Sequence, residues 1–253
     1  MSVPVHIPVL LYHQVNDKPS ATTTPPDVFR SHMEWLADNG WRSLRLDEFE
    51  AAVEGNQAPG HRSFLLTYDD GSADLSRCAV EMERCGFSGT AFLITGRQRA
   101  GDPASLSTEE VARLASQGTF EFQSHTERHV RVSPDQAGLD GLANDLIRSR
   151  DWLMENLNVP EKSVRHLAWP WGQCTPAMES LANELGFGWQ YLVQRGAVTH
   201  GSRQVRLPRL CADGMSLSQF SRWMTVMGSR PGGQLVNHVF GPIRRVRHGL
   251  AYW

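Results

Sequence analysis

The chain has 253 residues, 40% of them hydrophobic, and its formal net charge is -2. This length fits one large α/β domain or two small ones, with enough apolar residues for a substantial core. The near-neutral charge argues against a nucleic-acid partner. No run of about 18 apolar residues is present, so no membrane span is expected.

The N-terminal stretch 1–13, MSVPVHIPVLLYH, lacks a basic region and a small-residue cleavage site. It is typical of a first strand, and it predicts a cytoplasmic protein, although a chain whose leader had been removed would look the same. No C-x-x-C pair occurs among the cysteines, so free thiols are expected at all four positions: Cys78, Cys85, Cys174 and Cys211.

Strand-like and helix-like segments alternate from the first residues onward. In chain order we predict strand 5–12, helix 26–39, strand 41–46, helix 47–54, strand 64–68, helix 74–85, strand 90–95, helix 107–117, strand 119–124, helix 133–157, strand 164–168, helix 176–185, strand 187–193 and helix 216–227. Several helices end at a glycine that turns directly into a strand, as Gly40 and Gly186 do. Ser107, with Glu110 three residues later, is a helix-capping pattern.

About seven βα units without a linker predict a parallel sheet that is closed, or nearly closed, into a barrel. The G-x-G-x-x-G pattern of dinucleotide-binding folds is absent after the first strand. We therefore expect one catalytic domain over 1–228. The segment 229–253 is rich in Pro, Gly and Arg, and we expect an irregular basic tail there.

Residues suited to catalysis follow several predicted strands: Asp69 and Asp70, His125 and His129, the segment 169–172, and His13. In a βα barrel these strand ends form the functional face, so residues far apart in sequence would meet there.

The H-x3-H spacing of His125 and His129 places two imidazoles on one face of a helical turn, where they can share a metal. Two exposed loop histidines are the alternative. A metal would also make the Asp69–Asp70 pair tolerable, with one aspartate as ligand and the other as general base. A surface turn is the alternative for Asp-Asp-Gly, but the apolar run before it argues against a solvated loop.

The motifs T-Y-D-D-G, S-H-T-x-x-H and A-W-P-W-G, in this order, resemble the first three motifs of the polysaccharide deacetylases, the family-four carbohydrate esterases. The resemblance extends over about 8–220. It implies a distorted (β/α)7 barrel and metal-dependent removal of N-acetyl, sometimes O-acetyl, groups from sugars.

Carried over residue by residue, the resemblance makes Asp69 the catalytic base and Asp70, His125 and His129 the ligands of Zn2+ or another divalent metal. It implies that the Pro-Trp-Gly segment lines the substrate groove, with the Trp171 backbone N–H helping to hold the oxyanion. Pro170 and Trp169 belong to the same groove, although a tryptophan in a barrel is more often part of the core.

The N-terminal V-L-L-Y-H-Q-V resembles a narrower branch, the poly-N-acetylglucosamine deacetylases, and implies that His13 is the general acid. His238, in L-V-N-H, is the alternative acid. Ala168 stands where the family has an arginine that steadies the base, and Arg206 and Arg209 are candidates to replace that arginine.

The sequence thus predicts a metal-dependent hydrolase that removes N-acetyl groups from an acetylated amino-sugar glycan or precursor. Two alternatives stay open: an amidohydrolase that acts on a non-sugar C–N bond, and a catalytically silent barrel that binds glycan. The basic run 243–248 could contact an anionic partner or simply be solvated. The oligomeric state is not indicated.

Overall fold

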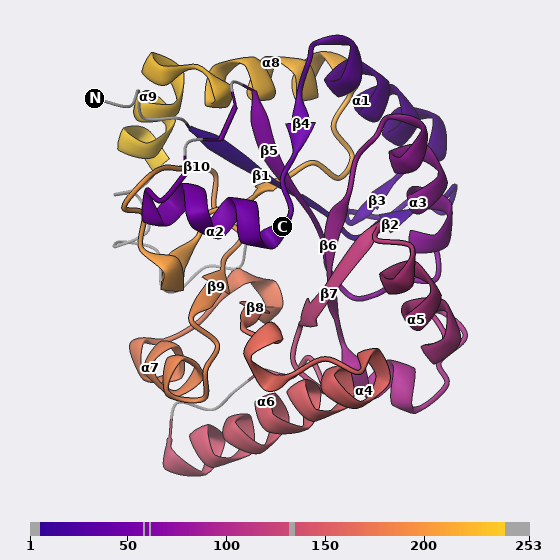
Figure 1. Cartoon of the computed structure of the whole chain (residues 1–253), viewed down its shortest axis with the longest axis vertical. Coiled ribbons are helices and arrows are strands. Elements are labelled where there is room, and N and C mark those ends of the chain that lie inside the picture. Colours follow the sequence, from indigo (N-terminus) through magenta and orange to yellow (C-terminus); the bar gives the residue numbers. More distant parts are fainter. Residues whose placement is uncertain (1–5, 58, 61, 132–134, 241–253) are drawn as a thin grey trace.

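The computed structural model describes residues 6–57, 59–60, 62–131 and 135–240. A curled β-sheet occupies the centre, and helices surround it (Figure 1). The wall of the barrel is formed by parallel strands: β1 Ile7–Tyr12, β5 Ser63–Tyr68, β6 Gly89–Leu93, β7 Phe120–Ser124, β8 His166–Ala168, β9 Trp189–Tyr191 and β11 Leu210–Cys211. This is the distorted (β/α)7 barrel that the sequence predicted.

The two longest wall strands, β1 and β5, are buried at every position, as expected for parallel strands that are covered on both faces. Alternate residues of each strand pack into two different hydrophobic clusters, one under the outer helices and one inside the barrel. Leu10 and Leu66 pack under the outer helices, whereas Val9 and Leu65 pack in the barrel interior. Each strand therefore holds its terminal residues in a fixed orientation at the mouth of the barrel.

A short segment closes the barrel between β9 and β1. Tyr191 of β9 forms a parallel bridge to Leu207, and three residues later β11 pairs with β1, with Leu210 opposite Leu10. Strand β10, Ala197–Val198, pairs antiparallel with the beginning of β1. Strands β10 and β11 have two residues each, which is too short for a periodic sequence signal, and the sequence analysis did not predict them.

The helices are α1 Pro26–Asp38, α2 Leu46–Glu54, α3 Leu75–Arg84, α4 Thr95–Arg99, α5 Thr108–Ser116, α6 Gln136–Leu157, α7 Pro176–Glu184, α8 Leu217–Gly228 and α9 Arg230–Phe240. Short 3-10 turns span Glu161–Ser163, Pro170–Gly172 and Gln204–Arg206, and three two-residue strands complete the fold: β2 Gln14–Val15, β3 Thr23–Thr24 and β4 Arg42–Ser43. The predicted capping pair is present, because Ser107 accepts from the Glu110 N–H and Glu110 accepts from the Ser107 N–H. Helix α2 contributes Phe49 and its neighbours to the barrel interior.

The prediction of an irregular tail from residue 229 is wrong for Arg230–Phe240, which forms α9. Glycine content lowers helix propensity, but here it permits close packing: a Cβ on Gly233 would lie 2.4 Å from the His6 ring. Val236 is buried, and the Asn237 side chain exchanges two hydrogen bonds with the Ala197 backbone, at 2.9 Å each. The basic run 243–248 lies outside the described residues. No helix in the described part of the chain is both long and apolar enough to cross a bilayer.

Candidate active site and metal centre

Three predicted metal ligands converge at the C-terminal mouth of the barrel. Asp70 follows β5, and His125 and His129 follow β7. Asp70 Oδ1 lies 3.6 Å from His125 Nε2 and 3.8 Å from His129 Nε2. All three donor atoms lie within 4.8 Å of one another.

These donors fit a divalent cation. Ligands at 2.0–2.2 Å from one tetrahedral ion lie roughly 3.3–3.6 Å apart. The two distances from Asp70, 3.6 and 3.8 Å, are already close to this range. His125 Nδ1 donates to the Ala168 carbonyl oxygen at 2.8 Å, which leaves the Nε2 lone pair facing the other two ligands. A backbone partner of this kind fixes the tautomer of metal-binding histidines. Several transition metals accept such nitrogen and oxygen donors, so the set does not select one.

The loop that carries His125 and His129 is not the helical turn that the H-x3-H spacing suggested. Residues 125–129 form a bend without helix, and Thr126 and His129 have positive φ angles of 66° and 51°. The His129 N–H donates to Thr126 Oγ1 at 3.0 Å, which stabilises this conformation. From α6, the buried Asp145 carboxylate accepts from the Glu127 N–H at 2.6 Å and holds the loop from behind.

The second aspartate of the pair is held by a buried arginine. The Arg209 guanidinium donates two hydrogen bonds, each 2.7 Å long, to the two oxygens of Asp69. Asp69 is 2% exposed and Arg209 is fully buried. Burial alone would raise the pKa of Asp69, but the positive charge of Arg209, helped by His125, holds that pKa well below its usual range. Asp69 is therefore ionised and held beside His125, one of the three candidate metal ligands.

Of the two arginines proposed as substitutes, only Arg209 reaches the site. Arg206 pairs instead with Glu179, Nε to Oε2 at 2.5 Å, and is partly exposed. Arg209 comes from the segment that closes the barrel, whereas the expected position at the end of β8 is occupied by the small, buried Ala168.

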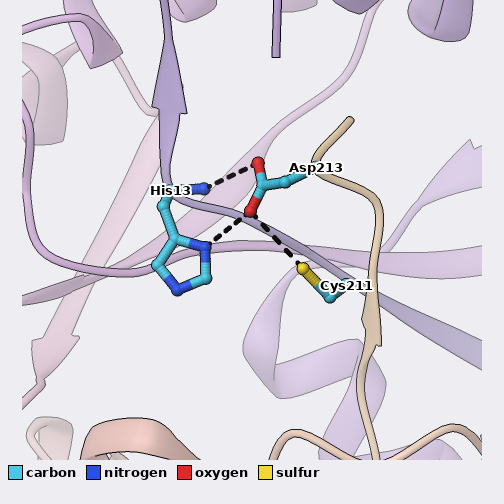
Figure 2. A group of neighbouring side chains, drawn as sticks. All are labelled: His13, Cys211 and Asp213. Atoms are coloured by element: carbon cyan, nitrogen blue, oxygen red, sulfur yellow. Dashed lines mark hydrogen bonds and ion pairs between the residues drawn. The ribbon is translucent and has the colours of Figure 1, made fainter. Parts of the chain in front are cut away.

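His13 lies at the end of β1 and is paired with an aspartate that the sequence analysis missed. Asp213 Oδ2 lies 2.6 Å from His13 Nδ1, and Asp213 Oδ1 accepts from the His13 N–H at 3.3 Å (Figure 2). Burial lowers the pKa of His13, but the hydrogen bonds to Asp213 and Cys211, together with the negative charges of Asp213 and Asp69, outweigh burial and raise that pKa well above its ordinary value. The imidazole is thus held as a proton donor.

Two further residues contact Asp213. Thr24 donates its hydroxyl to Oδ1 at 3.2 Å, and the Cys211 thiol lies 3.5 Å from Oδ2. The only sequence signal for Asp213 is the Asp-Gly pair directly after an unrecognised two-residue strand.

The structure separates the members of the predicted groove. Trp169 is 1% exposed and its indole N–H donates to Gln190 at 3.0 Å, so it belongs to the core and not to the groove. Pro170 is also buried. Trp171 is half-buried and has a positive φ of 55°, and the centroid of its ring lies 4.5 Å from the centroid of the His129 ring. Of these three residues, only Trp171 is placed to meet a substrate.

His238 does not lie at the site. It is exposed on α9, which packs against β10 beside the beginning of β1. His13 follows the end of the same strand, about 20 Å away at roughly 3.3 Å per residue. The geometry therefore favours His13 over His238 as the acid.

A barrel of this type, with a His-His-Asp cluster and an arginine-held aspartate at its mouth, is the arrangement expected of a carbohydrate deacetylase. The chain belongs to the polysaccharide deacetylase family, whose sequence model matches residues 56–189.

Individual relatives extend this match over most of the chain. Bacillus subtilis YxkH, a polysaccharide deacetylase by name, is 25% identical over 229 residues, which cover 88% of this chain and 78% of YxkH. The Streptococcus pyogenes deacetylase PplD, solved with acetate, superposes with a TM-score of 0.80 at 23% identity, covering 88% of this chain and 99% of PplD. IcaB from Ammonifex degensii gives a TM-score of 0.77 at 21% identity, covering 87% and 97%. The two structures support the same fold.

Proposed function

We propose that the protein is a divalent-metal-dependent N-deacetylase that acts on an acetylated amino sugar in a glycan or glycan precursor. The observation that carries this proposal is the juxtaposition of Asp70, His125 and His129, able to share one ion, with the ionised Asp69. A protein that only bound glycan would have no need for a buried base beside a metal site.

Each residue has a distinct task in this proposal. A bound divalent cation, Zn2+ for example, would polarise the acetyl carbonyl and acidify water. Asp69 removes the proton from the attacking water, and Arg209 keeps the carboxylate ionised and in place. The Trp171 backbone N–H donates to the oxygen that becomes negative, which contributes roughly 3–4 kcal/mol in other hydrolases.

The leaving amine needs a proton, and His13 is placed to supply it. Asp213 orients the imidazole and stabilises its charged form through the 2.6 Å contact to Nδ1. The proton for transfer is therefore the one on Nε2. An acid at the end of the first strand is the feature shared with the poly-N-acetylglucosamine deacetylases, and we infer a substrate of that chemical class.

An acetate-release screen tests the proposal. Defined N-acetylated glycans and small acetylated amides are incubated with the protein, with and without a chelator. We expect release from glycans, loss of release with chelator, and recovery on adding Zn2+. Release that survives complete chelation, or that occurs only from non-sugar amides, would refute the proposed activity.

Variants assign the roles. Asp69→Asn should retain metal and lose most activity, whereas His125→Ala should lower the bound metal itself. Asp47→Asn is a matched control, because Asp47 is exposed on α2, away from the mouth. Undiminished turnover in Asp69→Asn would exclude Asp69 as the base, and unchanged metal content in His125→Ala would exclude the ligand set.

A further inference from the structure

A second group of potential metal ligands lies beside the first. Among the residues that the structure describes, two sets of three donors could each share an ion, and the second set comprises His13, Cys211 and Asp213. We propose that these three residues form a second, inhibitory site for a thiophilic divalent cation such as Zn2+. The inhibitory role rests on the proposed function of His13; the site itself does not.

The donors are held together by the strand pairing that closes the barrel. Cys211 is opposite Leu11 in the β1–β11 ladder, and the Ala212 N–H donates to the Leu11 carbonyl at 2.9 Å. His13 is two residues beyond Leu11, and Asp213 is two residues beyond Cys211. Figure 2 shows the three side chains pointing toward one another from these two strands. Their donor atoms all lie within 4.8 Å of one another.

The spacing is close to what zinc requires. With Zn–S near 2.3 Å and Zn–O near 2.0 Å, sulfur and oxygen ligands on a tetrahedral ion lie roughly 3.5 Å apart. The Cys211 Sγ to Asp213 Oδ2 distance is already 3.5 Å. The Asp213 Oδ2 to His13 Nδ1 distance of 2.6 Å would have to widen by about 0.7 Å, to about 3.3 Å.

The donor chemistry distinguishes this site from the first one. Asp70, His125 and His129 offer only nitrogen and oxygen, whereas Cys211 adds a sulfur. Thiolate ligands favour zinc and other soft cations over hard ones. The second site should therefore bind Zn2+ in preference to Mg2+ or Mn2+.

Occupancy would disable the acid. A cation that binds Nδ1 of His13 and Sγ of Cys211 displaces the proton from each atom, and both protons pass to solvent. The metal then replaces the hydrogen bond between His13 and Asp213. An imidazole that is coordinated through Nδ1 cannot also carry two protons, so it has no readily released proton for the leaving amine. Inhibition by excess zinc follows.

Cobalt provides a direct test of binding. Co2+ bound to a thiolate gives a charge-transfer absorption band in the near ultraviolet, and nitrogen or oxygen ligands alone do not. We expect this band in the wild-type protein and in Cys85→Ser, a control that removes another partly buried thiol. We expect Cys211→Ser and Cys211→Ala to lack it and to bind one fewer Zn2+ per chain by elemental analysis. A band that persists without Cys211, or a wild-type protein that binds a single ion, would overturn the site.

Zinc titration of the deacetylase then tests inhibition. The rate of each protein in excess Zn2+ is compared with its own rate at one equivalent of Zn2+, so a change in the basal rate of Cys211→Ser does not enter the comparison. Excess Zn2+ should slow the wild type and Cys85→Ser at least ten-fold and leave Cys211→Ser nearly unaffected. Equal inhibition of all three would overturn the inhibitory role. If no glycan is deacetylated but the cobalt band depends on Cys211, the site stands and the proposed function fails.

Discussion

Replacing Arg209 with methionine should be among the most damaging single substitutions in the barrel. Methionine keeps much of the side-chain volume but leaves the buried Asp69 carboxylate without its two 2.7 Å partners. Removing one partner of a buried ion pair costs about 3–5 kcal/mol, because the remaining charge is uncompensated. The control is Arg206→Met, which breaks a partly exposed pair with Glu179 and should cost less than about 1 kcal/mol.

The pH dependence separates this cause from simple loss of packing. In the wild type, the pKa of Asp69 lies below its unfolded value of about 4, so the pair contributes its full stability above that pH and loses it as the pH falls through the folded pKa. Without Arg209, burial raises the pKa of Asp69 above the unfolded value. The variant then takes up a proton as the pH falls, and its deficit relative to the wild type should shrink.

Urea unfolding of both chelator-treated proteins at pH 7 and pH 4.5 measures the deficit. In metal-loaded protein, the acidic limb of the kcat/KM profile should move to higher pH in Arg209→Met. The double variant Asp69→Asn with Arg209→Met should recover at least half of the lost stability, since no isolated charge remains. A deficit that equals that of Arg206→Met, or that does not change with pH, would refute this account of Arg209.

Three further substitutions probe the surroundings of the site. Asp145→Asn weakens the support of the 125–129 loop, so zinc affinity in a chelator competition assay should fall about 10–100-fold. Burial lowers the pKa of His32 to about 4. The unfolded state therefore takes up its proton first, and the free energy of unfolding should decline as the pH falls from about 6.5 to about 4. In urea titrations, His32→Phe should remove up to about 3 kcal/mol of that decline. Gly172→Ala places a Cβ 2.3 Å from the Val193 backbone nitrogen at a φ of +63°, so its melting temperature and its activity should both fall.

Matched variants serve as controls for two of these three substitutions. Asp151 is exposed on α6, so Asp151→Asn, the control for Asp145→Asn, should bind zinc as the wild type does. Gly101→Ala has a similar positive φ of 65° but open space around the added Cβ, so it isolates the backbone strain from the clash. Zinc affinity unchanged by Asp145→Asn, an undiminished pH slope in His32→Phe, or equal losses at both glycines would contradict the respective arguments.

The barrel was predictable because its main strands and helices are long enough for periodicity and capping to be visible. The same reasoning failed where tertiary contacts decide the structure. Strands β10 and β11 are too short to have a period, and α9 forms despite its glycines because Gly233 allows it to pack closely against His6, directly before β1.

The clustering of the proposed metal ligands could be predicted from the sequence because parallel strands bring their C-terminal ends together. Asp70, His125 and His129 stand at such ends, in recognisable motifs. Residues that reach the site from other segments of the chain have no such motif in the sequence. Nothing in the sequence distinguishes Arg209 from Arg206 as the partner of Asp69. The path of the chain between β9 and β11 decides it, because it places Arg209 against Asp69 and Arg206 against Glu179. Asp213 follows an unrecognised strand.

The segment that closes the barrel has a role beyond closure, because it supplies the partners of both proposed proton-transfer groups, Asp69 and His13. Arg209 and Asp213 lie four residues apart, on either side of β11, and β11 is held to β1 by only two residue pairs. If this edge opened locally while the rest of the barrel stayed folded, the base and the acid would lose their supports together. Catalysis in this protein would then cease as a single event, well before the fold itself is lost.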